Sequence, residues 1–290
     1  MSDIRFRGAG VALVTPFTSA GEVDYPALER VTLHTINQGI DFLVVLGTTA
    51  ETPTLTTEEK DRIIQTILRV NSGRKPVVLG IGGNDTAAVI RQVRALPISG
   101  IDGILTVAPY YNKPNQTGLL RHFEAIGSIS PLPVIIYNVP GRTGCSISAD
   151  TTLKLASDVP KIIATKEASG NLEQIMVILR DRPEGFIVLS GDDSLTLPLM
   201  SLGAEGVISV AANLWPDKMS QMVHLALEGQ IAKARTLHFE MMELMSLIFA
   251  EGSPSGIKAA LNAAGICGNS LRLPLVPVSA ALQEKIESCL

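Results

Sequence analysis

The amino-acid sequence predicts an α/β protein built as a (β/α)8 barrel, because three of its features agree. Eight short apolar runs recur along the 290 residues, with starts roughly 20 to 34 residues apart, enough for one strand, one helix and two loops. The runs lack clean polar and apolar alternation, as expected for parallel strands covered by helices. Eight such units favour a closed barrel over an open sheet. The runs cover residues 11–17, 42–46, 76–81, 103–108, 134–139, 162–168, 186–189 and 206–210.

Stretches typical of helices separate these runs and continue beyond them. They include residues 25–38, 57–70, 86–96 and 171–179, and after Asn213 residues 217–228, 231–250, 255–264 and 279–288. Ser253 and Pro254 predict a helix start, with the serine as the cap and the proline in the first turn. We expect one domain, in which residues 1–213 hold the strands and most barrel helices. Residues 214–290 then hold the last barrel helix and accessory C-terminal helices.

Composition and charge exclude several classes of protein. With 46% hydrophobic and 18% charged residues, the chain has the composition of a globular protein with a large core. The net charge of -4 gives no indication of the positive charge that binding to nucleic acid or to an anionic membrane requires. No signal peptide or run of about 20 apolar residues is evident, so a cytoplasmic protein is expected. The three cysteines, Cys145, Cys267 and Cys289, lack paired spacing and predict free thiols.

Lys166 is the residue of greatest chemical interest, because it lies near the end of the apolar run at residues 162–168. Lysine is rarely buried unless it is paired or used. Burial favours the neutral amine, which is a nucleophile able to form a Schiff base with a carbonyl substrate. The alternative is a lysine that extends to solvent at the barrel rim or pairs with Glu167.

Polar residues follow the other apolar runs as well, and a (β/α)8 barrel carries its active site at this end of its strands. Neither a metal nor a cofactor is expected there. The four histidines are dispersed and lack the spacing of metal ligands. The glycine-rich residues 80–85 lack the third glycine and the acidic residue of a dinucleotide loop. The histidines are His34, His122, His224 and His238.

Four of these strand-end residues suit a carbonyl acid as the substrate. Thr48 and Thr49 follow a glycine turn, where backbone N–H groups can bind a carboxylate and a hydroxyl can pass protons. Tyr137 is expected to place a phenol near Lys166, or else to pack inside the barrel. Arg142 can bind a carboxylate through two parallel hydrogen bonds, or else it lies in a solvent-facing turn.

Five motifs in this order resemble the dihydrodipicolinate synthase family of pyruvate-dependent aldolases, whose members condense pyruvate with aspartate semialdehyde. The resemblance extends from residues 10–11 to the LRLP motif at residues 271–274. It implies a barrel enzyme of the pathway to diaminopimelate and lysine that needs no cofactor. The motifs are GTTAE at residues 47–51, YYNKP at 110–114, YNVPGRTG at 137–144, KEASGN at 166–171 and SGDD at 190–193.

The resemblance also implies a role for each site residue. Lys166 forms the imine with pyruvate, and Tyr137 is the general acid and base. Thr48 and Tyr111 complete a proton relay, in which the second tyrosine comes from the neighbouring subunit. The amides of Thr48 and Thr49 hold the pyruvate carboxylate, the Ile208 carbonyl lies near the lysine, and Arg142 meets the carboxylate of the semialdehyde. A tight dimer, doubled into a homotetramer, follows from this relay.

Two questions stay open at the level of sequence. Relatives such as N-acetylneuraminate lyase and the 2-keto-3-deoxy sugar acid aldolases share the lysine and the tyrosine, so they are the alternative function. A non-catalytic barrel is disfavoured because Thr48, Tyr111, Tyr137 and Lys166 are all present.

Lysine-inhibited members bind the amino acid with a histidine and a glutamate, where this sequence has Lys60 and Ala88. Weak inhibition by lysine is therefore expected.

Overall fold

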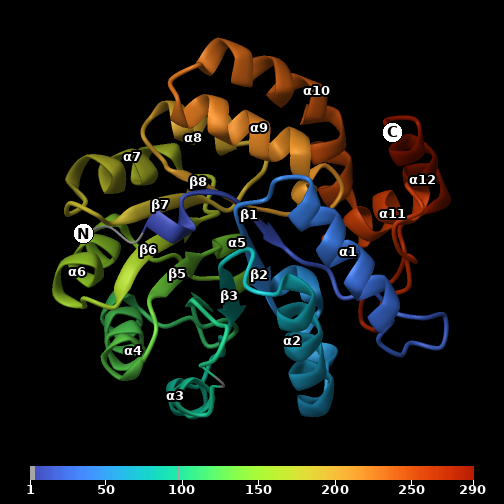
Figure 1. Ribbon diagram of the computed structural model, residues 1–290. Coiled ribbons are helices and arrows are strands. Elements are labelled where there is room, and N and C mark those ends of the chain that lie inside the picture. The colour runs from blue at the N-terminus through green and yellow to red at the C-terminus, as the bar shows by residue number, and fades with distance from the viewer. Residues whose placement is uncertain (1–3, 97) are drawn as a thin grey trace.

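The strands close into the predicted barrel. The computed structural model describes residues 4–96 and 98–290, and eight parallel strands of this part pair in chain order (Figure 1). The barrel closes where Gly8 of β1 pairs with Gly206 of β8. The predicted fold class is confirmed. The strands are β1 Gly8–Ala12, β2 Phe42–Val45, β3 Val77–Gly80, β4 Gly103–Val107, β5 Val134–Asn138, β6 Ile162–Glu167, β7 Ile187–Ser190 and β8 Gly206–Ser209.

Helices surround this barrel, and local capping explains where many of them begin. In α2 the Thr56 hydroxyl accepts from the Glu59 N–H while the Glu59 carboxylate accepts from the Thr56 N–H, which is a complete capping box. The Asp24 and Asn115 side chains cap α1 and α4 by accepting from the N–H groups of Ala27 and Gly118. The helices up to residue 227 are α1 Tyr25–Asn37, α2 Thr57–Asn71, α3 Thr86–Arg94, α4 Gln116–Ile129, α5 Pro140–Thr143, α6 Ala149–Asp158, α7 Leu172–Asp181, α8 Thr196–Ser201 and α9 Pro216–Leu227.

The first strand lies earlier than its apolar run predicts. The run at residues 11–17 indicated a strand there, whereas β1 covers Gly8–Ala12. Gly10 explains the difference, because a Cβ atom at this position would lie 2.2 Å from the ring of Phe42. A glycine has low strand propensity, yet here it makes room for an aromatic side chain inside the barrel. The need to pack Phe42 therefore outweighs local propensity.

The interior of the barrel is a small apolar cluster that is separate from the larger core between strands and helices. Tyr137, Ala164 and Ile208 belong to this inner cluster. Alternate residues of a strand share one face, so Lys166, two residues after Ala164, also points toward the barrel axis. The predicted reactive side chains are thus placed at the inner rim of the barrel.

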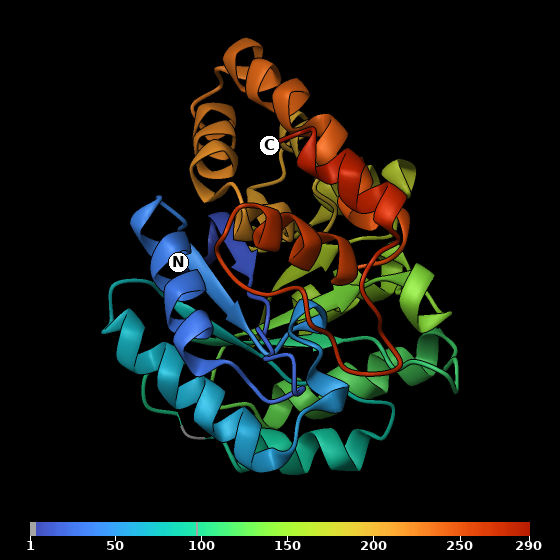
Figure 2. The same ribbon diagram turned by 90° about the vertical axis from the view of Figure 1, so that its right-hand side faces the viewer.

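Three further helices follow the barrel: α10 Ile231–Ala250, α11 Ser255–Ala263 and α12 Ala280–Glu287. α10 packs against α8 and α9, while α11 contacts α10 and the segment after β8. Figure 2 shows the red C-terminal segment passing close to the blue N-terminal part of the chain. The division of the chain at residue 213 stays a prediction. Within the described ranges, no helix is long and apolar enough to cross a membrane.

The predicted cap of α11 is wrong. Pro254 itself occupies the cap position, and no side chain caps the helix. Ser253 lies one residue too early for its hydroxyl to reach the first free N–H groups of the helix. Its carbonyl oxygen instead accepts a hydrogen bond from Arg142 at 3.2 Å. The junction between α10 and α11 therefore contacts the region of the predicted active site.

Candidate active site

Lys166 lies between two neighbouring strands at the carboxyl end of the barrel. It pairs with Tyr137 on β5 and with Leu189 on β7. The side chain is 5% exposed, and its amine lies 4.2 Å from the centre of the Tyr137 ring. In the part of the chain that the structure describes, no carboxylate lies within ion-pair distance of this amine. A buried amine without a paired anion is suited to act as a nucleophile.

The surroundings of Lys166 lower the pKa of its amine to about 8, which favours the neutral form. Burial is the main cause, because an ammonium ion loses its hydration there. The Asp193 carboxylate opposes this effect, and the positive charge of Arg142 reinforces it. Half of the amine is therefore neutral near pH 8, compared with a small fraction for a lysine in water.

Gly191 controls the direction of the Lys166 side chain. A Cβ atom at this position would lie 2.9 Å from Cε of Lys166 and 3.1 Å from Cγ. The loop after β7 therefore packs directly on the alkyl chain of the lysine, and its backbone N–H donates to the Glu167 carbonyl at 2.6 Å. Only a residue without a side chain allows this contact.

Tyr137 and Thr48 are brought together from β5 and from the turn after β2. The Thr48 hydroxyl is hydrogen-bonded to the Tyr137 phenol. Burial raises the pKa of this phenol, while Arg142 and the Thr48 hydrogen bond lower it. Thr48 and Thr49 form a short 3-10 helix, Thr48–Ala50, with Thr48 exposed and Thr49 buried. The phenol is therefore bonded to an exposed threonine, while its ring faces the amine of Lys166.

Arg142 and Ile208 flank this group. Arg142 lies in α5, directly after β5, and its exposed side chain acts on the pKa values of both Lys166 and Tyr137. Ile208 is buried on β8 and belongs to the same inner cluster as Tyr137. A guanidinium at the mouth of the barrel can bind a carboxylate with two parallel hydrogen bonds.

Tyr111 is not brought into this group within one chain. Its side chain is 88% exposed, and its backbone has a φ of 74°, which is uncommon for a non-glycine residue. Among the described residues, no hydrogen bond or ring contact joins Tyr111 to Thr48 or Tyr137. The single chain thus leaves this phenol at the surface.

Glu167 does not pair with Lys166, so that alternative for Lys166 is wrong. Its carboxylate accepts hydrogen bonds from Asn138 at 3.1 Å and from Ser169 at 2.8 Å. Burial raises the pKa of Glu167 to about 7, against the effect of these hydrogen bonds. Glu167 and Asn138 thereby join the ends of β6 and β5, next to Lys166 and Tyr137.

Asp193 is a second buried carboxyl group whose environment the sequence did not predict. One of its oxygens accepts from the N–H groups of Val210 and Ala211, at 3.1 and 2.9 Å. Burial raises the pKa of this carboxyl group. The only signal in the sequence is a pair of aspartates directly after an apolar run. Asp193 holds the segment after β8 and is the nearby negative charge for Lys166.

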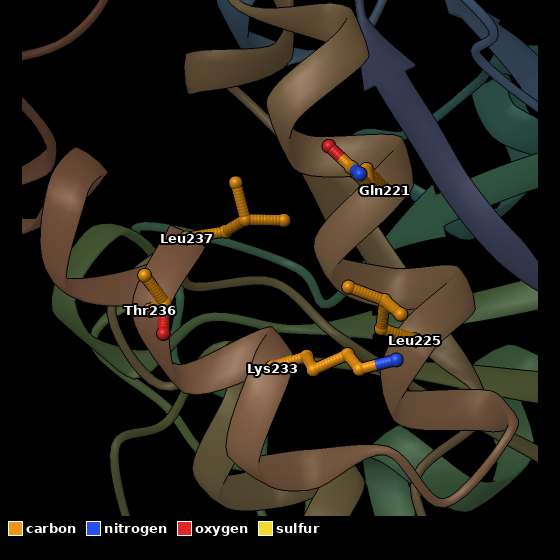
Figure 3. Close-up of a pocket in the computed structure, with 5 residues that line it drawn as sticks. All are labelled: Gln221, Leu225, Lys233, Thr236 and Leu237. Atoms are coloured by element: carbon orange, nitrogen blue, oxygen red, sulfur yellow. The ribbon is translucent and has the colours of Figure 1, made fainter.

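Other hollows and clusters lie apart from this group. A surface pocket between α9 and α10 contains none of the predicted site residues (Figure 3). Within residues 4–96 and 98–290, no group of three or more His, Cys, Asp or Glu side chains could hold a metal ion. The residues that line the pocket are Gln221, Leu225, Lys233, Thr236 and Leu237.

Comparison with known proteins settles which family this geometry represents. The model of the dihydrodipicolinate synthetase family matches residues 5–290. The chain belongs to this family. A curated relative from Parabacteroides distasonis, named 4-hydroxy-tetrahydrodipicolinate synthase, is 50% identical over all of this chain and 98% of its own length.

Solved structures of the dihydrodipicolinate synthetase family share the fold closely. Dihydrodipicolinate synthase from Aquifex aeolicus superposes with a TM-score of 0.94 and 43% identity, covering 98% of this chain and 96% of the other. The enzyme from Acinetobacter baumannii, solved in complex with pyruvate, gives a TM-score of 0.94 and 38% identity. That comparison covers 98% of this chain and 97% of the other.

Proposed function

We propose that this protein condenses pyruvate with L-aspartate 4-semialdehyde to 4-hydroxy-tetrahydrodipicolinate, in the biosynthesis of diaminopimelate and lysine. The observation that carries the proposal is the buried Lys166 amine beside the Tyr137 ring, with a pKa of about 8 and no paired anion among the described residues. Family membership and the names of the relatives support the same reaction. The Acinetobacter baumannii enzyme with bound pyruvate supports pyruvate as the first substrate. A biosynthetic role of this kind assigns the protein to the cytoplasm.

The reaction begins at Lys166. Its neutral amine attacks the ketone carbon of pyruvate, and Tyr137 donates a proton to the ketone oxygen. Water then leaves, and the imine passes a proton from its methyl group to Tyr137 to become an enamine. The enamine carbon adds to the aldehyde carbon of the semialdehyde, and Tyr137 returns the proton to the new alkoxide. The amino group of the semialdehyde then attacks the imine carbon, which closes the ring and releases the Lys166 amine. Thr48 and Tyr111 carry protons between Tyr137 and the solvent.

The remaining residues bind the two carboxylates. Backbone N–H groups of Thr48 and Thr49 hold the carboxylate of pyruvate, since the turn that contains them lies at the mouth of the barrel. The Ile208 carbonyl lies close to the lysine, and Arg142 binds the carboxylate of the semialdehyde. The carboxylate of a short second substrate is suited to binding by a guanidinium, whereas a sugar acid needs protein groups that bind its hydroxyls.

We further propose a homodimer as the active unit, and a homotetramer made of two such dimers. The exposure of Tyr111 supports this proposal, because a phenol that is 88% exposed in one chain is free to enter the site of a second chain. The proton relay of the family needs a second tyrosine beside Thr48, and within one chain Tyr111 does not lie there.

Borohydride trapping tests the proposed chemistry. With pyruvate present, reduction should attach the pyruvate carbons to the peptide that carries Lys166, as detected by mass spectrometry. Lys166→Met should give no adduct. An adduct on another lysine would refute the assignment. A coupled assay with pyruvate and aspartate semialdehyde, run beside one with N-acetylneuraminate, separates the proposed reaction from the sugar acid alternative.

A further inference from the structure

A second buried lysine lies outside the catalytic group. Lys258, on α11, is 0% exposed, and its ammonium donates to the Glu51 carboxylate, which is also fully buried. The same ammonium donates to the Ser270 carbonyl at 2.9 Å and lies 4.2 Å from the centre of the Phe17 ring. Glu51 and Lys258 are 207 residues apart in the sequence. The pair therefore joins the first quarter of the chain to its C-terminal segment.

Glu51 closes the turn that contains Thr48 and Thr49. Its backbone N–H donates to the Thr48 carbonyl at 3.2 Å. Its φ of 55° lies in the left-handed region, which is unfavourable for any residue other than glycine. Such a conformation persists only where the surroundings hold it in place. The second carboxylate oxygen of Glu51 accepts from the Arg272 N–H at 3.1 Å. The surroundings that hold this turn thus come from the C-terminal segment.

The same segment also reaches the other side of the site. The Ser253 carbonyl accepts from Arg142 at 3.2 Å. The Arg272 side chain donates to the carbonyls of Gly21 and Thr54, each at 2.8 Å, and pairs with Glu59 on α2. Figure 2 shows this red segment running beside the blue N-terminal part of the chain. Residues 253–272 therefore contact both carboxylate-binding parts of the proposed site.

We propose that Glu51 and Lys258 are a positioning pair, through which the C-terminal segment holds the Thr48 and Thr49 amides in the orientation that binds the carboxylate of pyruvate. The inference rests on the proposed function. Both side chains are fully buried and bonded to each other, so in this proposal they act through the turn and not on the substrate. Loss of the pair frees the left-handed turn and misdirects the two N–H groups. An error of about 1 Å in a binding group can cost about 100-fold in rate.

Three variants test this inference. For each, we measure the pyruvate concentration at which borohydride traps half of the maximal amount of adduct. Lys258→Met removes the ammonium but leaves Glu51 charged and buried. The double variant Glu51→Gln with Lys258→Met leaves no unpaired charge. Lys154→Met is the matched control, since Lys154 forms an exposed ion pair with Asp158 on α6. Circular dichroism and thermal melting report the folded fraction of each variant.

We expect Lys258→Met to raise the half-saturating pyruvate concentration about tenfold or more, while kcat at saturating pyruvate changes less than about threefold. The double variant should melt closer to the unchanged protein than Lys258→Met does, yet keep the weak binding of pyruvate. Lys154→Met should bind pyruvate normally. If the double variant binds pyruvate as the unchanged protein does, the pair contributes only stability and the inference fails. Absence of any adduct in the unchanged protein overturns the proposed function as well.

Discussion

Lys166 and Lys258 are both buried, yet their surroundings give them opposite properties. Lys166 ends a strand inside the barrel, and its amine faces the ring of Tyr137. Lys258 lies on a helix outside the barrel, and its ammonium is bonded to the Glu51 carboxylate and to a backbone carbonyl. Burial lowers the pKa of both amines. At Lys258 the charge of Glu51 and the direct bond to it oppose this effect and favour the protonated form.

The difference shows that burial alone does not make a lysine reactive. Asp193 is the carboxylate that acts on Lys166, but two backbone N–H groups already occupy one of its oxygens. The charge of Asp193 is therefore partly neutralised by the backbone, and the Lys166 amine can lose its proton near pH 8. A buried lysine becomes a nucleophile where the nearest anion is already engaged, and a structural cation where the anion bonds to it directly.

Removing the phenol that we propose as the proton carrier beside Lys166 should give the largest effect. Tyr137→Phe keeps the ring that faces the amine and deletes the hydroxyl that Thr48 contacts. We expect turnover to fall by roughly 10²- to 10⁴-fold, the range for a general acid and base, with little change in melting temperature. Steady-state kinetics with both substrates measures this. Full activity of the variant would show that the phenol is only packing.

Replacing each buried lysine by methionine should change stability in opposite directions. Lys258→Met leaves Glu51 charged and unpaired, so the free energy of unfolding should fall by about 3–5 kcal/mol. Lys166→Met removes an amine whose pKa is lowered to about 8, and the free energy of unfolding at pH 7 should rise by roughly 1–3 kcal/mol. Urea denaturation of both variants measures the two changes.

The sign of the Lys166 effect can be checked with pH. A lowered lysine pKa means that the folded state resists protonation, so the cost is complete below pH 8 and disappears as the pH approaches 10.5. The stability gained by Lys166→Met should shrink over that interval. A gain that is the same at both ends would assign it to packing instead of charge.

The pH dependence of imine formation should separate Lys166 from an ordinary lysine. With subsaturating pyruvate, the rate of trapping by cyanoborohydride reports the free enzyme, and it should fall about tenfold per pH unit below the pKa of about 8. The rate should level off above that pH. A rate that continues to rise through pH 10 would mean that the amine has the pKa of an exposed lysine.

Free L-lysine should have the smallest effect of all. Lys60 lies on α2 and Ala88 on α3, and the resemblance to the family implies a histidine and a glutamate at these two places in its lysine-inhibited members. Ala88 offers no carboxylate to the ammonium of the ligand, and Lys60 repels it. Loss of a partner for a buried charge costs about 2–5 kcal/mol, or roughly 30- to 5,000-fold in affinity. Half-inhibition below about 1 mM in the coupled assay would contradict this expectation.

The sequence predicted the barrel and the place of Lys166 near the end of a strand, because both depend on local patterns: apolar runs mark strands, and Lys166 lies near the end of one run. The inward direction of its side chain follows only from the structure, in which Ala164, two residues earlier, belongs to the inner cluster. The start of β1 could not be predicted in this way, because a glycine is needed at residue 10 to make room for the ring of Phe42, which is distant in the sequence. The bond between Lys258 and Glu51 has no local signal either, because nothing near residue 258 indicates a partner 207 residues earlier.

That long separation has a consequence for the order in which the protein becomes active. During synthesis, residues 1–213 leave the ribosome first and carry Lys166, Tyr137 and Arg142 with them. The contact of Glu51 with Lys258 forms only after residue 258 has emerged, and its contact with the Arg272 N–H only after residue 272 has emerged. A nascent chain that has completed its strands therefore still lacks the contacts that hold the turn proposed to bind pyruvate. On the proposed role of the pair, tight binding of pyruvate therefore follows the emergence of residues 258 and 272, well after the last strand.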